Sequence, residues 1–381
     1  MPKMLRWLAP LVVLGLAAAC STDSSSDSAT PTTAARTSAA AVSLEGVCPE
    51  KLVLQTDWFP EAEYGAYYSL IGPNGTVDAD KGAYSGPLMD TGVELEIRAG
   101  GPFIGQQTVQ SLMYQDDTIN LGLVHTDDAV RFSKQLPVVG VMGPLEHSPL
   151  AVVWDKSVHT INSWADVGAS GGKVLVFTKA VNYVPFLINK GLVPEANFDD
   201  SFDGSYSRFT ADNSLIQQAF VTETPFRLQN EITAYGKEVG ELLVSESGYD
   251  PYLSSLSVKA SDLEALKPCL AKLVPLVQQA QVDYMKDPTV AHGVMVDVAT
   301  KLDTFWTLSP ELLAFGNEKM AEYDIVSNGD DSTLGNFDTA RVQQVIDDFT
   351  ATFGADVPTA EPIVTPSLIV TNEFIDNNIG L

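Results

Sequence analysis

From Cys48 onward, the hydrophobic positions alternate between the spacing of strands and the spacing of helices. The first short, β-prone runs are KLVLQT, VELEIRA, INLGLV and LPVVGVM, with helix-compatible stretches between them. In one such stretch, IGQQTVQSLMY, one helical face carries Val109, Leu112 and Met113; in another, TDDAVRFSK, Thr126 is a candidate N-cap. Strands that alternate with helices through short connections form parallel sheets covered by helices. The sequence therefore predicts an α/β fold.

A second series of elements follows residue 160. Its segments are INSWADV, KVLVF, YVPFLINKGL, a predicted strand at 205–211 (SYSRFTA), a predicted helix at 213–220 (NSLIQQAF), and the return stretches ELLVSE and YLSSLSV. A long helix predicted at 261–287 begins with the capping-box pair Ser261 and Glu264. A later helix begins at Asp338 and buries one face, formed by Val342, Val345, Ile346 and Phe349. This order predicts two α/β units, the second inserted into the first, with a turn-rich, hairpin-like insert at 72–92.

The N-terminus has the parts of an export signal. Lys3 and Arg6 precede the apolar run WLAPLVVLGL, and small residues lead to Cys20. The run is shorter than the roughly 20 residues of a spanning helix; a membrane anchor helix is the alternative. Small residues directly before a cysteine resemble the bacterial lipobox, in which the cysteine is lipidated. We therefore expect a signal peptide at 1–19 and a lipidated, flexible Ser/Thr/Ala tether at 20–47, which holds the protein at a membrane surface.

The chain is long, apolar enough for a large core, and strongly acidic. Its 381 residues are 45% hydrophobic, which suffices for two domains or one two-lobed domain. With 22 basic and 49 acidic side chains, the net charge is -27. Removal of Lys3 and Arg6 with the signal peptide leaves 20 basic against 49 acidic residues, a net charge of −29. A protein that binds nucleic acid needs clustered Lys and Arg, so nucleic acid is excluded as a partner.

Two cysteines, Cys48 and Cys269, remain once Cys20 is lipidated. Outside the cytoplasm, an even pair indicates a disulfide. Two unrelated buried thiols are the alternative. The four histidines, His125, His147, His159 and His292, lack the spacing of metal ligands, so we expect no metal site.

Three stretches at predicted strand ends carry side chains suited to a ligand, because ligands of open α/β sheets bind beyond the carboxyl ends of strands. In TDWFPEAEYGAYY, Trp58 and Tyr64 offer flat rings, and Glu61 and Glu63 offer acceptors. The neighbouring tyrosines, 67 and 68, are equally well explained as ordinary packing. These features predict a surface that grips a planar solute.

The other two stretches are AGGPFIGQQ and FVTETPF. In the first, the Gly100–Gly101 turn precedes a helix, so its backbone amides can face a ligand; a simple turn is the alternative. In the second, the Glu223 carboxylate could accept hydrogen bonds from an amino or ring N–H group; a solvated turn is the alternative. The glycine spacing does not match a dinucleotide fingerprint.

In this order, LQTDWFPEAEYGAYY, IRAGGP, LGLVHTDD and FVTETPFRLQNE resemble the NMT1/THI5-like (SsuA/THI5-like) group of substrate-binding proteins. Members of this group serve ABC importers of thiamine-pyrimidine precursors, riboflavin, nitrate and sulfonates. The resemblance covers residues 48–257 and, less closely, LIVTNEFI near the C-terminus. It implies a two-lobed, type II periplasmic-binding-protein-like fold, each lobe a sheet with helices on both faces. Lobe I would comprise 48–147 and 245–381, and lobe II 148–244.

The resemblance also implies roles for individual residues. Trp58 and Tyr64 would stack on a flat heterocycle. From lobe I, the bonding residues would be Gly100, Gly101, Thr126 and Asp127. From lobe II, the closing residues would be Thr178, Asn182, Tyr183, Glu223 and Phe226.

The implied function is that of a monomeric, lipid-anchored, extracytoplasmic receptor for an ABC permease. It would capture a small planar heterocycle or small organic solute (thiamine-pyrimidine, riboflavin or sulfonate/nitrate class) by hinge closure, without catalysis or cofactor. One alternative is an enzyme like the branch of this group that makes the thiamine pyrimidine; that branch has a cysteine-rich iron motif, which this chain lacks. GASGG at 168–172 matches G-x-S-x-G but precedes its strand instead of following it. A surface sensor or adhesin lipoprotein is the other alternative.

Overall fold

The computed structural model describes residues 42–178, 181–354 and 357–381. The predicted signal peptide, Cys20 and the tether up to residue 41 lie outside these ranges. The first sheet has seven strands in the order β2-β3-β4-β1-β5-β12-β6. These strands are β1 (Lys51–Gln55), β2 (Thr76–Asp78), β3 (Ala83–Pro87), β4 (Glu94–Arg98), β5 (Leu121–Val124), β6 (Val138–Met142) and β12 (Ser255–Lys259). We call this sheet and the helices that cover it lobe I.

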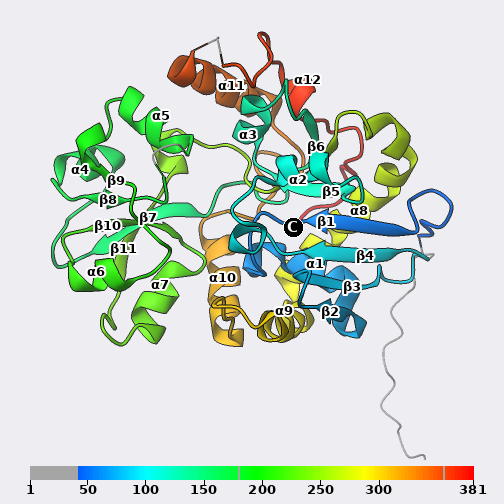
Figure 1. Ribbon diagram of the computed structural model, residues 1–381, viewed down its shortest axis with the longest axis horizontal. Helices are drawn as coiled ribbons and strands as arrows, with labels where there is room; N and C mark the ends of the chain where they lie inside the picture. The colour runs from blue at the N-terminus through cyan, green and yellow to red at the C-terminus, as the bar shows by residue number, and fades with distance from the viewer. Residues whose placement is uncertain (1–41, 179–180, 355–356) are drawn as a thin grey trace, which may run out of the picture. The chain divides into compact units, whose positions relative to one another are not determined.

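The second sheet, with its helices, forms lobe II and has five strands in the order β11-β7-β10-β8-β9 (Figure 1). They are β7 (Leu150–Asp155), β8 (Val174–Leu175), β9 (Phe198–Asp199), β10 (Ile216–Phe220) and β11 (Val239–Leu243). The chain leaves the first sheet after β6 and returns to it at β12, so the strands of lobe II are contiguous in sequence. Two segments, 143–149 and 244–254, connect the sheets.

The helices flank these sheets. Those of lobe I are α1 (Gly65–Ile71), α2 (Val109–Gln115), α3 (Thr126–Arg131), α8 (Leu263–Lys286), α9 (Thr289–Leu302), α10 (Pro310–Glu322), α11 (Thr339–Phe353) and α12 (Pro366–Ile369). Those of lobe II are α4 (Trp164–Ala169), α5 (Tyr183–Asn189), α6 (Ser207–Ala211) and α7 (Thr224–Phe226). The predicted α/β fold is confirmed.

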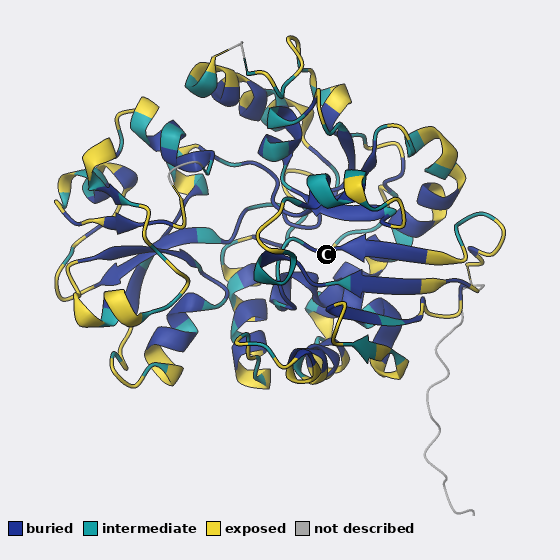
Figure 2. Ribbon diagram, viewed as in Figure 1, coloured by how far each residue is buried: buried dark blue, intermediate teal, exposed yellow. Residues whose placement is uncertain are grey.

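Both faces of the first sheet are buried. Along β1, Leu52 and Leu54 pack into the cluster that includes α1 and α8, whereas Val53 packs into the cluster that includes α2, α3 and α11. Side chains alternate across a strand, so a sheet with helices on both faces has strands that read as continuous apolar runs. Figure 2 shows this burial along the strands of both sheets.

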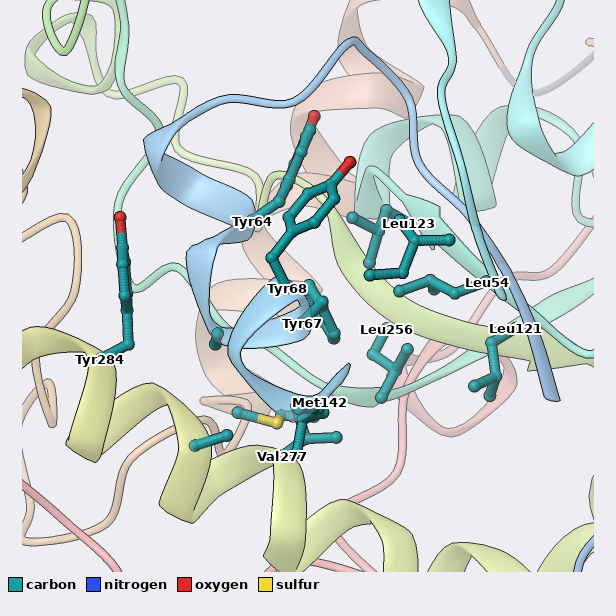
Figure 3. Packing of buried hydrophobic residues seen from close by; sticks show 14 of the residues in the cluster. Leu54, Tyr64, Tyr67, Tyr68, Leu121, Leu123, Met142, Leu256, Val277 and Tyr284 are labelled. Atoms are coloured by element: carbon teal, nitrogen blue, oxygen red, sulfur yellow. The ribbon is translucent and has the colours of Figure 1, made fainter. Parts of the chain in front are cut away.

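The largest buried cluster is rich in tyrosine. Tyr64, Tyr67 and Tyr68 are each at most 2% exposed and lie in the same cluster as Leu54 and Leu123 (Figure 3). Tyr67 and Tyr68 are therefore core residues of α1.

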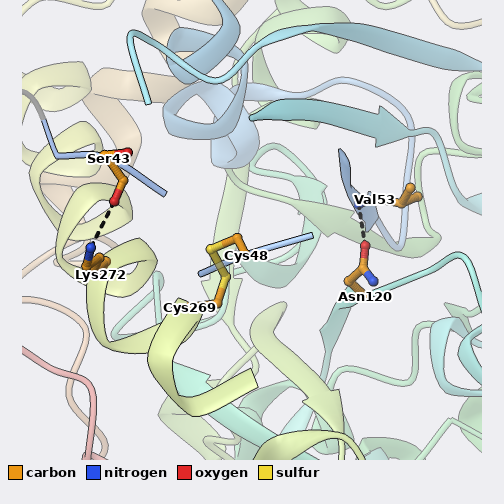
Figure 4. Close-up of a disulfide and its surroundings, with 6 residues drawn as sticks. All are labelled: Ser43, Cys48, Val53, Asn120, Cys269 and Lys272. Carbon is orange, nitrogen blue, oxygen red and sulfur yellow. Dashed lines mark hydrogen bonds between the residues drawn. A yellow bond between two sulfur atoms is a disulfide. The ribbon is translucent and has the colours of Figure 1, made fainter. Parts of the chain in front are cut away.

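A disulfide joins Cys48 to Cys269, as expected from the even cysteine pair (Figure 4). Cys48 precedes β1, and Cys269 lies in α8, where it is 1% exposed. Beside the bridge, Lys272 Nζ donates to the Ser43 carbonyl oxygen at 3.0 Å. The start of the described chain is thereby fixed to the longest helix.

Several local predictions were wrong. Residues 207–211 form helix α6, not a strand, and residues 216–220 form strand β10, not a helix. Both sheets are mixed: β12 runs antiparallel to β5 and β6, and β7 antiparallel to β10.

Of the predicted helix caps, that of Asp338 forms, whereas those of Thr126 and of the Ser261–Glu264 pair do not. Asp338 caps α11 as predicted, because its side chain accepts from the Ala340 N–H. Thr126, however, is the first residue of α3, and the N-cap is His125. Helix α8 begins after Asp262 with no side-chain cap, so the Ser261–Glu264 capping box does not form.

Candidate functional site

The candidate site lies where strand ends of both lobes meet. In lobe I, β1, β4 and β5 are parallel, so the residues that follow them lie at one edge of the sheet. Asp57, Gly100 and His125 occupy these positions. Ser254, directly before the antiparallel β12, lies at the same edge. This is the edge at which open α/β sheets bind ligands.

Asp57 connects these strand ends through its carboxylate. It accepts hydrogen bonds from Tyr64 Oη at 2.7 Å and from Ser254 Oγ at 2.9 Å, and it lies 2.9 Å from His125 Nε2. Burial raises the pKa of Asp57, but the contact with His125 and the hydrogen bonds from Tyr64 and Ser254 together outweigh burial, so the pKa lies below the usual range. Burial likewise lowers the pKa of His125, but Asp57 reverses this and raises it to about 9. The two residues therefore form an ion pair at neutral pH.

The glycine turn after β4 packs against the loop that carries Trp58. A Cβ atom at Gly100 would lie 2.2 Å from the Thr56 carbonyl oxygen. A Cβ atom at Gly101 would lie 2.4 Å from Cε3 of the Trp58 ring, and Gly101 has a φ of +59°. The two glycines therefore allow the turn to approach this ring, which gives them a positioning role in the structure.

Aromatic rings from two other segments lie beside Trp58. Its ring centroid lies 5.9 Å from that of Trp306 and 6.4 Å from that of Phe177. Trp306, between α9 and α10, is held by a hydrogen bond from its Nε1 to the Pro60 carbonyl oxygen at 2.8 Å. Phe177 follows β8 in lobe II and is 38% exposed. Trp58 therefore contacts a ring from the opposite lobe.

Carboxylates of both lobes meet beside these rings. Glu63 lies in the 3-10 turn Ala62–Tyr64, and Glu61 directly precedes this turn. Together with Glu223, both line a cavity of about 10 Å³. The other lining residues are Ala62, Thr222, Trp306, Leu308, Leu312 and Leu313. That volume is about the size of one water molecule, so the lobes are in contact here.

Burial changes the pKa values of Glu61 and Glu63. Thr222 Oγ1 donates to Glu63 Oε1 at 2.5 Å, which lowers the pKa of Glu63. Burial has the larger effect and, with the nearby charges of Glu223 and Asp57, raises the pKa of Glu63 to about 7. Burial and the charges of Glu63 and Asp57 also raise the pKa of Glu61 well above its usual range. Glu63 therefore takes up a proton near neutral pH.

Glu223 is fully engaged within lobe II. Its carboxylate accepts hydrogen bonds from Tyr206 Oη at 2.9 Å, from Thr224 Oγ1 at 2.9 Å, and from Arg227 Nε. Arg227 also reaches lobe I, where its Nη2 donates to the Thr307 carbonyl oxygen at 2.6 Å and its guanidinium carbon lies 5.3 Å from the centroid of Trp306. Glu223 thus anchors an arginine that contacts both lobes.

A second polar contact between the lobes is centred on Asn182. Its Nδ2 donates to Asp127 Oδ2 at 2.8 Å and to Asp128 Oδ1 at 3.2 Å, and its Oδ1 accepts from Arg131 Nη1 at 2.9 Å. Tyr249 Oη also donates to Asp127 Oδ2. Burial and the adjacent charge of Asp127 raise the pKa of Asp128 to about 6.

No protein-family model matches the chain, and no curated protein matches its sequence. Three solved structures match it with a TM-score of 0.51. An ABC transporter from Parabacteroides distasonis is 9% identical, with 84% of this chain and 99% of that one covered. The alkanesulfonate-binding protein SsuA from Xanthomonas axonopodis pv. citri is 10% identical, with 85% of this chain and 99% of that one covered. A protein from Bordetella bronchiseptica is 12% identical, with 86% of this chain and 96% of that one covered.

The chain has the two-lobed periplasmic-binding-protein fold. At these identities the likeness concerns the fold alone, and the resemblance to the NMT1/THI5-like group stays a prediction. Among the described residues, no helix is long and apolar enough to cross a membrane. Nor, in those same ranges, do three or more His, Cys, Asp or Glu side chains gather into a group that could hold a metal ion.

The predicted ligand residues are distributed unevenly over this two-lobed fold. Trp58 packs edge-to-face against Trp306, and Glu223 lines the same cavity as Trp306. Asn182 donates to Asp127 across the lobes. Thr178, exposed, lies next to Phe177.

Other predicted residues are turned to internal partners in this structure. Tyr64 is 2% exposed and holds Asp57. Thr126 pairs with the backbone of Tyr252 through its N–H and its hydroxyl. Tyr183 donates to Gln218 Oε1 at 2.7 Å, within lobe II. The Phe226 ring packs across the lobes on Phe315 of α10, with the ring centroids 5.5 Å apart.

Five residues of this region had not been predicted from the sequence: Asp57, His125, Phe177, Trp306 and Arg227. Four of them, all but Trp306, lie directly beside predicted residues, so the strand-end rule already pointed to their positions. Trp306 lies between two helices, far from any strand end, and no local signal marks it. Only the tertiary fold brings it to Trp58.

Proposed function

We propose that this protein is the solute-binding component of an ABC importer, which captures a small organic solute between its two lobes and delivers it to a membrane permease. It acts as a monomeric, extracytoplasmic receptor, lipidated at Cys20, with lobe boundaries near residues 147 and 244. The observation that carries the proposal is the contact of Trp58 in lobe I with Phe177 in lobe II, on a two-lobed binding-protein fold. The three solved structures with this fold, an alkanesulfonate-binding protein among them, support it.

The mechanism follows from the contacts between the lobes. Hydrogen bonds of Thr222 and Asn182 to residues of lobe I form only when the lobes are together. A solute that contacts both lobes favours the closed form by its differential affinity for that form. A flat solute stacked on Trp58 would gain about 1–3 kcal/mol per ring, a useful share of the roughly 8 kcal/mol of a micromolar receptor.

The test is a thermal-shift screen of the full chain against small solutes of varied charge and shape, including riboflavin, thiamine pyrimidines, nitrate and taurine. We expect at least one compound to raise the unfolding midpoint and to reduce the radius of gyration in small-angle X-ray scattering. Trp58→Ala should weaken the binding of that compound at least tenfold. The matched control is Tyr235→Ala, which removes a partly buried ring of lobe II that packs on Phe209. A screen without any stabilising compound, or equal losses of binding in both variants, would contradict the proposal.

A further inference from the structure

The charge of the candidate site is not that expected for an anion receptor. Six carboxylates lie in the candidate site, that is, around the strand ends of lobe I, the cavity beside Trp306 and the Asn182 contact: Asp57, Glu61, Glu63, Asp127, Asp128 and Glu223. Three basic side chains accompany them, and each is already bound: His125 to Asp57, Arg131 to Asn182 and Arg227 to Glu223. The described side chains therefore carry a net charge of about −3 when all are ionised.

Glu61 and Glu63 are the carboxylates without a compensating cation. Within residues 42–178, 181–354 and 357–381, neither forms a salt bridge, whereas Glu223 has Arg227 and Asp57 has His125. Glu63 is 3% exposed, and its hydrogen-bond partner is the neutral hydroxyl of Thr222. Buried charges cost free energy unless they are paired or protonated. A cation delivered to this place would supply the missing pairing.

A second, separate observation also indicates a hydrogen-bond donor. Asp127 is 7% exposed, and its Oδ1 has no hydrogen-bond partner among the described residues, although its Oδ2 has two. Buried polar atoms are nearly always satisfied. Since an ionised carboxylate oxygen only accepts, the group that satisfies Oδ1 is a donor, an N–H group of a solute or the O–H of a water molecule.

The aromatic rings beside the carboxylates suit a cation as well. The guanidinium of Arg227 lies over the Trp306 ring at 5.3 Å and pairs with Glu223, so one positive group of the chain already uses a ring and a carboxylate together. Trp58 adjoins Trp306 in an edge-to-face contact, and Glu61 and Trp306 line the same cavity. A cation over a ring face is attracted by the ring quadrupole, most strongly over Trp.

Building on the proposed function, we propose that the solute is a small organic cation with N–H donors, such as an amidinium or a protonated amino heterocycle, held by Glu61 and Glu63 and by the face of Trp58. A nitrate or sulfonate would find no unpaired cation beside Glu61 and Glu63 and would be repelled by these carboxylates whenever they are ionised, because like charges repel in a site of low dielectric constant. The proposal thus selects one class among the solutes that the fold could accommodate.

The test uses three planar probes of one shape and different charge: benzamidinium, benzamide and benzoate. Titration calorimetry of the full chain at pH 7 should rank them in that order, with benzamidinium bound at least about tenfold more tightly than benzoate. Because a bound cation lowers the pKa of neighbouring carboxylates, benzamidinium should also release protons, which appears as a dependence of the measured enthalpy on the ionisation enthalpy of the buffer. Benzoate or benzamide binding as tightly as benzamidinium would overturn the proposal, as would the absence of binding by all three.

Glu61→Gln should weaken benzamidinium about tenfold and leave benzoate unchanged or bound more tightly. Glu63→Gln is the second variant, and the exposed Glu50→Gln is the matched control, expected to change neither affinity. Equal effects of Glu61→Gln and Glu50→Gln would count against the cation. If the wider solute screen yields no ligand at all, the proposed function fails; if it yields an anion that closes the lobes, the proposed function stands and only this inference fails.

Discussion

Thr222 donates a hydrogen bond to the Glu63 carboxylate across the two lobes, at 2.5 Å and over 159 residues of sequence. Glu63 belongs to a 3-10 turn of lobe I, and Thr222 follows strand β10 of lobe II. The contact therefore buries a carboxylate only while the lobes are together. Opening the lobes would return Glu63 to water, so the opening of the lobes and the protonation of Glu63 are coupled.

Lower pH should stabilise the closed protein through Glu63. Its pKa rises from an ordinary value of 4.5 to about 7, so the native state binds more protons than the unfolded state between these values. The stabilisation by the protonated form is complete below about 4.5 and is lost as the pH rises to about 7. We expect the difference in unfolding midpoint between Glu63→Gln and the wild type to grow in favour of the variant from pH 5 to pH 8, measured by calorimetry.

The control for this series is Glu50→Gln, an exposed residue at the start of β1. Its difference from the wild type should not change with pH. If Glu63→Gln gives a difference from the wild type that is likewise independent of pH, Glu63 is ionised in the native state and the assigned pKa is wrong.

The stabilisation by the ion pair of Asp57 and His125 should also be lost as the pH rises, but at higher pH than that of Glu63. The pKa of His125 rises from 6.5 to about 9, so its stabilisation is complete below about 6.5 and disappears as the pH rises through about 9. His125→Gln should therefore lower the unfolding midpoint by several degrees at pH 6.5 and by much less at pH 10. The matched variant is His159→Gln, whose ring binds the Ser214 carbonyl oxygen near the surface. A loss of stability by His125→Gln that is the same at both pH values would show that packing, not charge, is what the substitution removes.

The Cys48–Cys269 disulfide should be a large contributor to stability, because it closes a loop with a sequence separation of 221 residues. Chain-entropy arguments give about 5 kcal/mol for such a loop, and measured values are often nearer 2–4 kcal/mol. Reduction should therefore lower the unfolding midpoint by roughly 5–15 °C. The Cys48→Ser/Cys269→Ser protein should melt where the reduced wild type does and should not respond to reductant. Unchanged melting of the wild type after reduction, verified by thiol labelling, would rule this contribution out.

The sequence predicted the coarse fold because that depends on features repeated along the chain. Apolar runs marked strands in both sheets, among them β1, β5, β6 and β8, and the cysteine count led to the bridge between Cys48 and α8. Local patterns failed at 205–220, where the predicted strand is helix α6 and the predicted helix contains strand β10. QQAF in β10 has its side chains buried on both faces by lobe II, which overrides the helical spacing of NSLIQQAF.

For the site, strand ends located Trp58, the glycine turn and Glu223, because that rule rests on the general geometry of α/β sheets. The strand-end rule could not predict which polar groups would form hydrogen bonds within the protein. Tyr64 and Thr126 were predicted to meet a ligand, yet their hydroxyls bind Asp57 and the Tyr252 backbone. The pairing of Thr126 with Tyr252, like the approach of Trp306, depends on contacts between segments more than a hundred residues apart, which no short pattern encodes. The bond of Tyr64 to Asp57 is local, but it forms only because the burial of Tyr64 turns its hydroxyl to that carboxylate.

Asn182 should control the balance between open and closed lobes. It is 7% exposed and links three charged residues of lobe I, Asp127, Asp128 and Arg131, to the start of α5 in lobe II. Asn182→Ala removes two donors from adjacent carboxylates and leaves their mutual repulsion uncompensated, so the cost falls on the closed form alone. We expect a larger radius of gyration in small-angle X-ray scattering than for the wild type, and affinity for a ligand lowered by the fraction of the closed form that is lost.

The comparison variant is Asn189→Ala, on the same helix. Asn189 makes one exposed hydrogen bond, at 3.3 Å, to the Ala351 carbonyl oxygen of lobe I. An exposed bond between the lobes contributes little, because water replaces it when the lobes part. Asn189→Ala should therefore leave both the radius of gyration and the affinity near the wild-type values. If the two variants open the protein equally, the number of bonds between the lobes governs closure; if only Asn182→Ala does, the buried carboxylates behind Asn182 hold the lobes together.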